Sequence, residues 1–193
     1  MNWRTKQWKD HFYRMAPLMN YRARSAFKLL QIHNKFKVFT KNSTVIDLGC
    51  APGSWMQVSK EMGASFVVGI DLLPIKPIPG TYFGQIDFMN NDLVDEFLLS
   101  IKSPNFFDLV LSDMAPDISG IPDLDLASSL ELVSAVLKFG NARLKKGGSI
   151  IIKCFECPDL HKLTRGTFNN IRFFKPTASR SDSTEIYLIA INN

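Results

Sequence analysis

The chain has 193 residues, of which 46% are apolar and 21% are charged. This length allows one domain with a full core and is too short for two ordinary domains. No apolar run is long enough to span a bilayer, and the N-terminal residues lack the apolar stretch of a secretory signal. Three cysteines are too few for a disulfide framework, so we expect a cytoplasmic protein. A basic, acid-poor start leaves a mitochondrial location as the alternative.

The net charge of +5 is unevenly distributed along the chain. Residues 1–41 hold ten Lys and Arg but one acid, Asp10, whereas the acids outnumber the cations in the rest. Aromatic residues lie among these cations: Trp3, Trp8, Phe12, Tyr13 and Tyr21. A basic segment with interleaved aromatics predicts a surface for a polyanion such as RNA. A solvated amphipathic arm is the alternative.

The first predicted element is a helix over Arg22–Lys37, with Asn20 as its cap. Its apolar residues fall on one side, and a separate polar stripe follows helical spacing at Arg24, Lys28, Gln31 and Lys35. Within this basic arm and helix, the candidate RNA contacts are Arg22, Arg24 and Lys35.

From Ser43 onward, apolar strand patterns alternate with helix patterns. The predicted strands are Thr44–Leu48, Phe66–Ile70, Tyr82–Ile86, Phe107–Ser112, Ser149–Lys153, Ile171–Phe174 and Glu185–Ile191. The predicted helices are Ser54–Met62, Asp92–Ile101, Leu124–Leu144 and a weaker one near Asp159–Gly166. This order predicts an α/β, doubly wound, mostly parallel sheet of seven strands in a single domain over residues 1–193. The last two strands have no helix between them, so the final strand is expected to be antiparallel.

The sequence VIDLGCAPGSW joins the first of these strands to a glycine-rich turn. In such a sheet the ligand lies beyond the carboxyl ends of the strands. Gly49 and Gly53 would let a ligand approach the backbone and the start of the next helix. Asp71 ends the second strand, where it could accept hydrogen bonds from both hydroxyls of a ribose. Asp87 ends the third strand, where an adenine edge would lie.

Two ligands compete for this turn. A nicotinamide dinucleotide favours G-x-G-x-x-G, but here a proline lies inside G-x-x-x-G. Strand-end acids at Asp47, Asp71, Asp87 and Asp113 would repel a diphosphate and favour a sulfonium cation. The pattern therefore favours S-adenosylmethionine, with no metal. Simple capping of the following helices would explain one or two of these acids, but not the series.

Six segments together resemble the FtsJ-type (RrmJ-like) ribose 2′-O-methyltransferases. They are YRARSAFKL, VIDLGCAPGSW, GIDLLP, DLVLSDMAP, IIKCF and KPTASRSDSTEIYLIA, in the same order and at similar spacing, from about residue 10 to the end. The resemblance implies a Rossmann-like methyltransferase fold and an S-adenosylmethionine loop at the glycine turn. The cofactor residues that follow are Gly49, Ala51, Pro52, Gly53, Trp55, Asp71, Asp87 and Asp113. For Trp55, core packing is the alternative.

The same resemblance implies a catalytic set, called the tetrad below: Lys28, Asp113, Lys153 and Glu185. A ribose hydroxyl is a poor nucleophile, so a site must align it with the methyl donor and remove its proton. Lys153 follows an apolar strand, and burial with the like charge of Lys28 is expected to lower its pKa and make it the base. Asp113 would hold Lys153 and face the sulfonium. Lys28 and Glu185 would orient the hydroxyl.

Other residues allow more than one interpretation. Cys154 and Cys157 form C-x-x-C, but no second such pair is present, so ordinary thiols are expected rather than a zinc or redox site. Lys175, Arg180 and the loop Thr177–Thr184 are either phosphate contacts or a turn.

The sequence thus predicts an S-adenosylmethionine-dependent RNA methyltransferase that acts on a ribose 2′-hydroxyl. Within the resembling family, the bacterial and mitochondrial branch is most similar, which implies a uridine in large-subunit ribosomal RNA. A transfer RNA anticodon loop is the second candidate substrate, and a messenger cap is the third. A non-catalytic RNA-binding assembly factor and a nicotinamide oxidoreductase are the rival classes. The expected partner is ribosomal RNA or the ribosomal particle, with no membrane, and the protein is expected to be a monomer.

Overall fold

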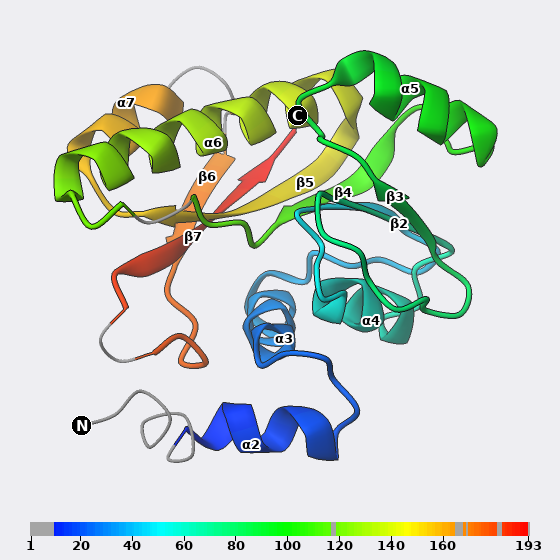
Figure 1. Cartoon of the computed structure of the whole chain (residues 1–193), viewed down its shortest axis with the longest axis horizontal. Coiled ribbons are helices and arrows are strands. Elements are labelled where there is room, and N and C mark those ends of the chain that lie inside the picture. Colours follow the sequence, from blue (N-terminus) through cyan, green and yellow to red (C-terminus); the bar gives the residue numbers. More distant parts are fainter. Residues whose placement is uncertain (1–9, 117–118, 165–167, 169, 181–182, 193) are drawn as a thin grey trace.

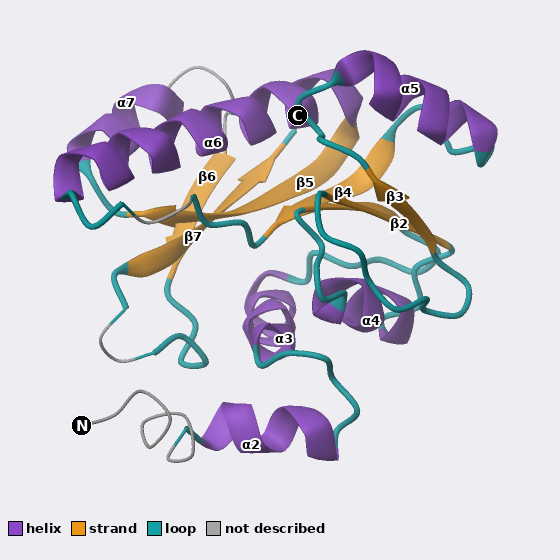
Figure 2. Cartoon of the chain, viewed as in Figure 1, coloured by secondary structure: helices purple, strands orange, loops and turns teal. Residues whose placement is uncertain are grey.

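A seven-stranded sheet forms the centre of the molecule, with helices on both faces (Figures 1 and 2). The computed structural model describes the chain except residues 1–9, 117–118, 165–167, 169, 181–182 and 193. The strand order is β3-β2-β1-β4-β5-β7-β6. The strands are β1 (Thr44–Leu48), β2 (Phe66–Asp71), β3 (Tyr82–Gln85), β4 (Phe107–Ser112), β5 (Leu144–Phe155), β6 (Asn170–Phe174) and β7 (Glu185–Ile191).

Neighbours from β3 to β5 pair in parallel, while β7 pairs antiparallel with both β5 and β6. The predicted doubly wound, mostly parallel sheet with an antiparallel last strand is therefore confirmed. The strand order reverses between β1 and β4, so the carboxyl ends of these two strands flank the position where ligands bind in such sheets.

The helices divide between the two faces of the sheet (Figure 1). Two clusters of buried hydrophobic residues lie on the two faces of the sheet. One packs the sheet against α5, α6 and α7, and the other packs it against α3 and α4. The helices are α2 (His11–Leu18), α3 (Ser25–Phe36), α4 (Ser54–Glu61), α5 (Asn91–Ser100), α6 (Pro122–Arg143) and α7 (Pro158–Thr164). Among these described helices, none is both long and apolar enough to cross a membrane.

The N-terminal region differs from the prediction. The chain forms α2, for which no helix is predicted; Asp10 caps it by accepting from the Tyr13 N–H, and Pro17 lies in its last turn. The predicted helix from Arg22 begins only at Ser25, and Asn20 has a left-handed φ of 59° instead of capping it. The backbone N–H of Arg22 donates to Gln57 Oε1 at 2.9 Å. This contact ties the segment to α4 and delays the helix.

The other predicted boundaries agree within a few residues, except that β5 begins at Leu144, well before the predicted Ser149. Three predicted features include residues outside the described ranges: the basic segment with Trp3 and Trp8, the expected helix end at Gly166, and the loop Thr177–Thr184, which contains residues 181–182.

Candidate active site

Strand alternation places the site's charged residues on one face of the sheet. Successive side chains of a strand point to opposite faces. Leu111 of β4, Ile151 of β5 and Tyr187 of β7 all pack in the cluster on the α3 side. Asp113 and Lys153 lie two residues beyond the first two of these, and Glu185 lies two before the third. These three side chains therefore face α3, which contributes Lys28.

The four predicted catalytic residues form one cluster. Lys28 Nζ lies 2.5 Å from Glu185 Oε1 and 4.0 Å from Asp113 Oδ1, and Lys153 Nζ lies 3.4 Å from Asp113 Oδ1. Lys153 also donates a hydrogen bond to the backbone carbonyl of Asp113. All four side chains are less than one-fifth exposed. Two cations and two carboxylates thus share a nearly dry space at the carboxyl ends of the strands.

The ion pairs keep the carboxylate of Glu185 charged. Burial opposes ionisation of this side chain, but Lys28, Ser179 and Lys153 together outweigh it, so the pKa of Glu185 lies below its usual value. The cluster can therefore hold a hydroxyl between fixed donors and fixed acceptors, which is the geometry that general acid–base chemistry requires.

Tyr187 is a member of the site that the sequence interpretation missed. Its hydroxyl donates to Asp113 Oδ1 at 2.6 Å, and Lys28 Nζ lies 5.5 Å from its ring centroid. Burial and the charge of Asp113 raise the pKa of Tyr187 well above its usual value, so the hydroxyl stays a donor. The E-x-Y spacing was the available signal, because it places Tyr187 on the same face as Glu185.

The glycine turn lies at the switch in strand order. Gly49 has φ 68°, and a Cβ there would lie 1.9 Å from the Met114 side chain, so only glycine fits. The two carboxylate oxygens of Asp71 accept from the N–H groups of Ala51 at 2.7 Å and Leu73 at 2.8 Å. Asp71 therefore anchors the turn to the end of β2, and each oxygen keeps a lone pair for a further donor.

Asp47 is the most confined acid of the site. It is 1% exposed, and its Oδ2 has no hydrogen-bond partner among the described residues. Burial, followed by the charges of Asp113 and Asp71, raises the pKa of Asp47 well above its usual range. A buried carboxyl with an unused oxygen is costly in the free protein, and an incoming cation would relieve that cost.

The remaining predicted cofactor residues occupy different environments. Asp87 is exposed beyond β3, and its Oδ1 accepts from the Met89 N–H at 2.9 Å. Pro52 lies in the turn, and its carbonyl accepts from Arg22. Trp55 is 2% exposed, and its Nε1 donates to the Ser25 carbonyl at 2.8 Å. This burial favours core packing for Trp55 over direct contact with a ligand.

The three candidate RNA contacts all have partners within the protein. The guanidinium of Arg22 donates to the carbonyls of Pro52, Lys76 and Pro77. Arg24 pairs with Asp10 and donates to the Ala178 carbonyl. Lys35 Nζ lies 4.3 Å from the ring centroid of Phe174. Arg22 thus clamps the glycine turn, and a role of these residues in RNA binding stays a prediction.

The cysteines have ordinary environments. Cys50 and Cys154 are buried free thiols, and burial raises the pKa of Cys154 to about 12. In the part of the chain that the structure describes, no group of three or more His, Cys, Asp or Glu is placed to hold a metal ion.

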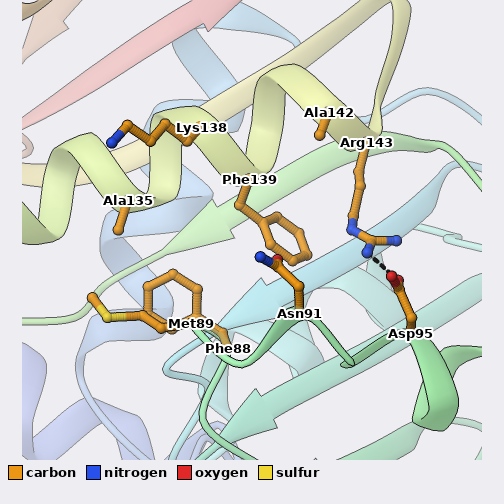
Figure 3. Close-up of a pocket in the computed structure, with 9 residues that line it drawn as sticks. All are labelled: Phe88, Met89, Asn91, Asp95, Ala135, Lys138, Phe139, Ala142 and Arg143. Carbon is orange, nitrogen blue, oxygen red and sulfur yellow. Dashed lines mark hydrogen bonds and ion pairs between the residues drawn. The ribbon is translucent and has the colours of Figure 1, made fainter. Parts of the chain in front are cut away.

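A cavity lies on the opposite face of the sheet from the tetrad, between the start of α5 and the second half of α6 (Figure 3). It has a volume of about 330 Å³, and Arg143 pairs with Asp95 at its side. Its lining contains no member of the tetrad: Phe88, Met89, Asn91, Asp95, Ala135, Lys138, Phe139, Ala142 and Arg143.

The strained ionisation of Asp47 leads to a stability prediction. In the unfolded chain this carboxyl ionises near ~3.9, whereas in the folded protein it holds its proton to a higher pH. Between these two pKa values folding takes up a proton, so stability falls as the pH rises. Asn does not titrate. The ligand-free Asp47→Asn variant should therefore be more stable than wild type by about 1–3 kcal/mol near pH 8, with a smaller difference near pH 4.

Urea unfolding at several pH values measures this difference. Glu96→Gln is the control, because Glu96 is an exposed carboxylate on α5. A stability difference for Asp47→Asn that is independent of pH would show that the buried carboxyl does not titrate as described.

Comparison with known proteins agrees with this geometry. The model of the FtsJ-like methyltransferase family matches residues 21–193. A protein named ribosomal RNA large subunit methyltransferase E from Methanothrix thermoacetophila is 40% identical, over 94% of this chain and 71% of its own. A protein of the same name from Coxiella burnetii is 39% identical, over 97% and 92%. A solved structure from Plasmodium falciparum, described as a ribosomal RNA methyltransferase, has a TM-score of 0.77 at 31% identity, covering 89% of this chain and 98% of that one. This chain therefore belongs to the FtsJ-like methyltransferase family.

Proposed function

We propose that this protein transfers a methyl group from S-adenosylmethionine to a ribose 2′-hydroxyl in large-subunit ribosomal RNA. The observation that carries the proposal is the tetrad, in which Lys153 and Lys28 face Asp113 and Glu185 within 2.5–4.0 Å. The names of the relatives support the choice of ribosomal RNA. Ribosomes occur in the cytoplasm and in mitochondria, which agrees with either expected location.

The residues around the glycine turn fit the proposed cofactor. Gly49 and Gly53 both have left-handed φ values, which set the backbone of the tight turn after β1. Asp71 can accept from ribose hydroxyls with the lone pairs that its two backbone contacts leave free. Within the described part of the chain, Asp47 Oδ2 has no hydrogen-bond partner, and a cationic ligand nearby would stabilise the charged form of this carboxyl. S-adenosylmethionine supplies a methyl group already activated by its positively charged sulfur.

The four residues of the tetrad would then orient the ribose hydroxyl and remove its proton. Lys28 would position the ribose hydroxyl by donating to its oxygen, and Glu185, 2.5 Å from Lys28 Nζ, would orient that ammonium. Lys153, in its neutral form, would take the hydroxyl proton as the new carbon–oxygen bond forms. Asp113 would keep Lys153 in place through the 3.4 Å contact, while Tyr187 fixes the carboxylate of Asp113.

The direct test is transfer of tritiated methyl groups to three substrates: large ribosomal subunits, free large-subunit ribosomal RNA and total transfer RNA. Mapping of alkali-resistant positions then locates the methylated ribose. We expect incorporation into the ribosomal substrates at one position. Incorporation into transfer RNA alone would replace the proposed substrate, and cofactor binding without any transfer would favour a non-catalytic RNA-binding protein.

The cofactor site can be tested through Asp71. Asp71→Ala should weaken S-adenosylmethionine binding by about 1–3 kcal/mol, because it removes charge-assisted hydrogen bonds to the ribose and the anchor of the turn. Asp71→Asn keeps one oxygen and should lose less. Titration calorimetry without divalent ions measures both, with Glu96→Gln as the control. Unchanged affinity in Asp71→Ala, or binding that depends on a metal ion, would contradict the assigned pocket.

Lys153 gives the sharpest test of the chemistry. Lys153→Ala should lower the single-turnover rate by about 100-fold or more, with cofactor and RNA binding nearly intact. Lys153→Arg should be almost as slow, because a guanidinium keeps the charge but does not release its proton. The wild-type rate should rise with pH, because the reaction requires a deprotonated base.

The measurement is methyl transfer with saturating RNA over a pH series. Lys146→Ala, at an exposed lysine of the same strand, is the matched control and should change the rate by less than about two-fold. A near wild-type rate for Lys153→Arg would mean that the residue supplies only positive charge, and alignment would then carry the catalysis.

A further inference from the structure

Another cavity, distinct from the one between α5 and α6, borders the tetrad. It has a volume of about 420 Å³ and is lined by Arg24, Lys28, Arg180, Ser183 and Glu185. Two of these residues, Lys28 and Glu185, belong to the tetrad and pair with each other at 2.5 Å. Anything bound in this cavity would therefore lie against the groups that hold the reacting hydroxyl.

The charge of the cavity is opposite to that of the turn. Lys28 and Glu185 neutralise each other, which leaves the guanidiniums of Arg24 and Arg180. Burial, followed by the charge of Arg180, lowers the pKa of Arg24, so the two guanidiniums are close enough to repel each other. Arg24 is offset by Asp10, but the exposed Arg180 side chain has no ion pair or hydrogen bond among the described residues. An anion between the two would complete the site.

The loop between β6 and β7 holds Arg180 and Ser183 in place. The Ser183 N–H donates to the Arg180 carbonyl at 3.1 Å, which sets both residues on one turn. Lys175 Nζ donates to the Ser183 carbonyl at 2.7 Å. The Ser183 hydroxyl accepts from the Glu185 N–H at 3.2 Å, so its own proton is free to be donated.

The same loop is fastened to α3 at Ala178. Arg24 donates to the Ala178 carbonyl, and the Ala178 N–H donates to Gln31 Oε1 at 3.0 Å. The cavity is therefore built from two segments far apart in the sequence, and it presents guanidinium and hydroxyl donors toward one space. Such donors match the oxygens of a phosphodiester, because a guanidinium can bind two of them at once.

We propose that this cavity holds the internucleotide phosphate attached to the reacting ribose, with Arg180 as its main ligand and Ser183 as a second donor. The inference rests on the proposed function and adds the residues that set the RNA strand on the tetrad. A phosphate is attached, through an ester oxygen, to the carbon next to the one that carries the 2′-hydroxyl. A ribose held against Lys28 and Glu185 would therefore place its phosphate in the adjoining space, where the cavity lies.

The test compares Arg180→Ala with Arg172→Ala, because Arg172 is also an exposed arginine, on β6, and does not line this cavity. Single-turnover methylation of unmethylated large ribosomal subunits is measured against subunit concentration at several salt concentrations. Arg180→Ala should raise the half-saturating concentration about ten-fold and lower the slope of log affinity against log salt by about 1. The rate at saturation should change little, because a phosphate contact is made equally before and during the reaction.

Two further measurements separate this role from a structural one. Arg180→Lys should keep the salt slope and recover part of the affinity, since it keeps the charge but not the fork. The thermal midpoint and S-adenosylmethionine affinity of Arg180→Ala should equal those of wild type. The proposal fails if Arg180→Ala matches Arg172→Ala, or if its loss comes with weaker cofactor binding or lower stability. If the wild-type protein binds the cofactor but methylates no RNA, the proposed function itself fails.

Discussion

Charge balance in a nearly buried space is the constraint on which the rest of the site depends. Neither Lys28 and Lys153 nor Asp113 and Glu185 could remain charged there alone, because burial without a counter-ion costs several kcal/mol per ion in order of magnitude. The four groups must therefore arrive together from α3, β5, the end of β4 and β7. The parallel order of β4 and β5 and the antiparallel return of β7 bring them to one edge. At this edge of the sheet, the fold therefore brings together two lysines and two carboxylates whose charges sum to zero.

Asp113 separates two regions of opposite sign. On one side, Asp47 and Asp71 make the glycine turn acidic, and the raised pKa of Asp47 records how poorly that charge is compensated in the free protein. On the other side, Arg24 and Arg180 line a basic cavity. A cationic methyl donor and an anionic RNA strand would therefore approach the tetrad from different sides without competing. Burial of the Asp47 carboxylate lowers the stability of the free protein. The same buried carboxylate would favour binding of a cation on the acidic side.

The sheet was predictable from the sequence because it depends on local pattern, whereas the four residues of the tetrad were taken from the resemblance to the FtsJ-type family. Apolar runs and their two-residue alternation specify strands and also the face on which Asp113, Lys153 and Glu185 lie. The partners of Arg22 and Arg24 were not predictable in this way. Their guanidiniums bind backbone carbonyls of turns far along the chain, and a carbonyl carries no side-chain signature. For the same reason, the helical spacing of the polar stripe predicts an exposed face, whereas in the fold Arg24 and Gln31 of this stripe contact the loop between β6 and β7.

This packing gives the basic N-terminal region a role beyond charge. Arg22 donates a hydrogen bond to the carbonyl of Pro52 in the glycine turn. Two residues later, Arg24 donates to the carbonyl of Ala178 in the loop that carries Arg180. Just beyond them, α3 begins and presents Lys28 to Glu185. One short segment therefore joins the acidic turn, the basic cavity and the tetrad. An RNA strand that contacted this segment would therefore also affect the position of the glycine turn. The reason is that Arg22, a candidate phosphate contact, is the side chain that holds the turn in place.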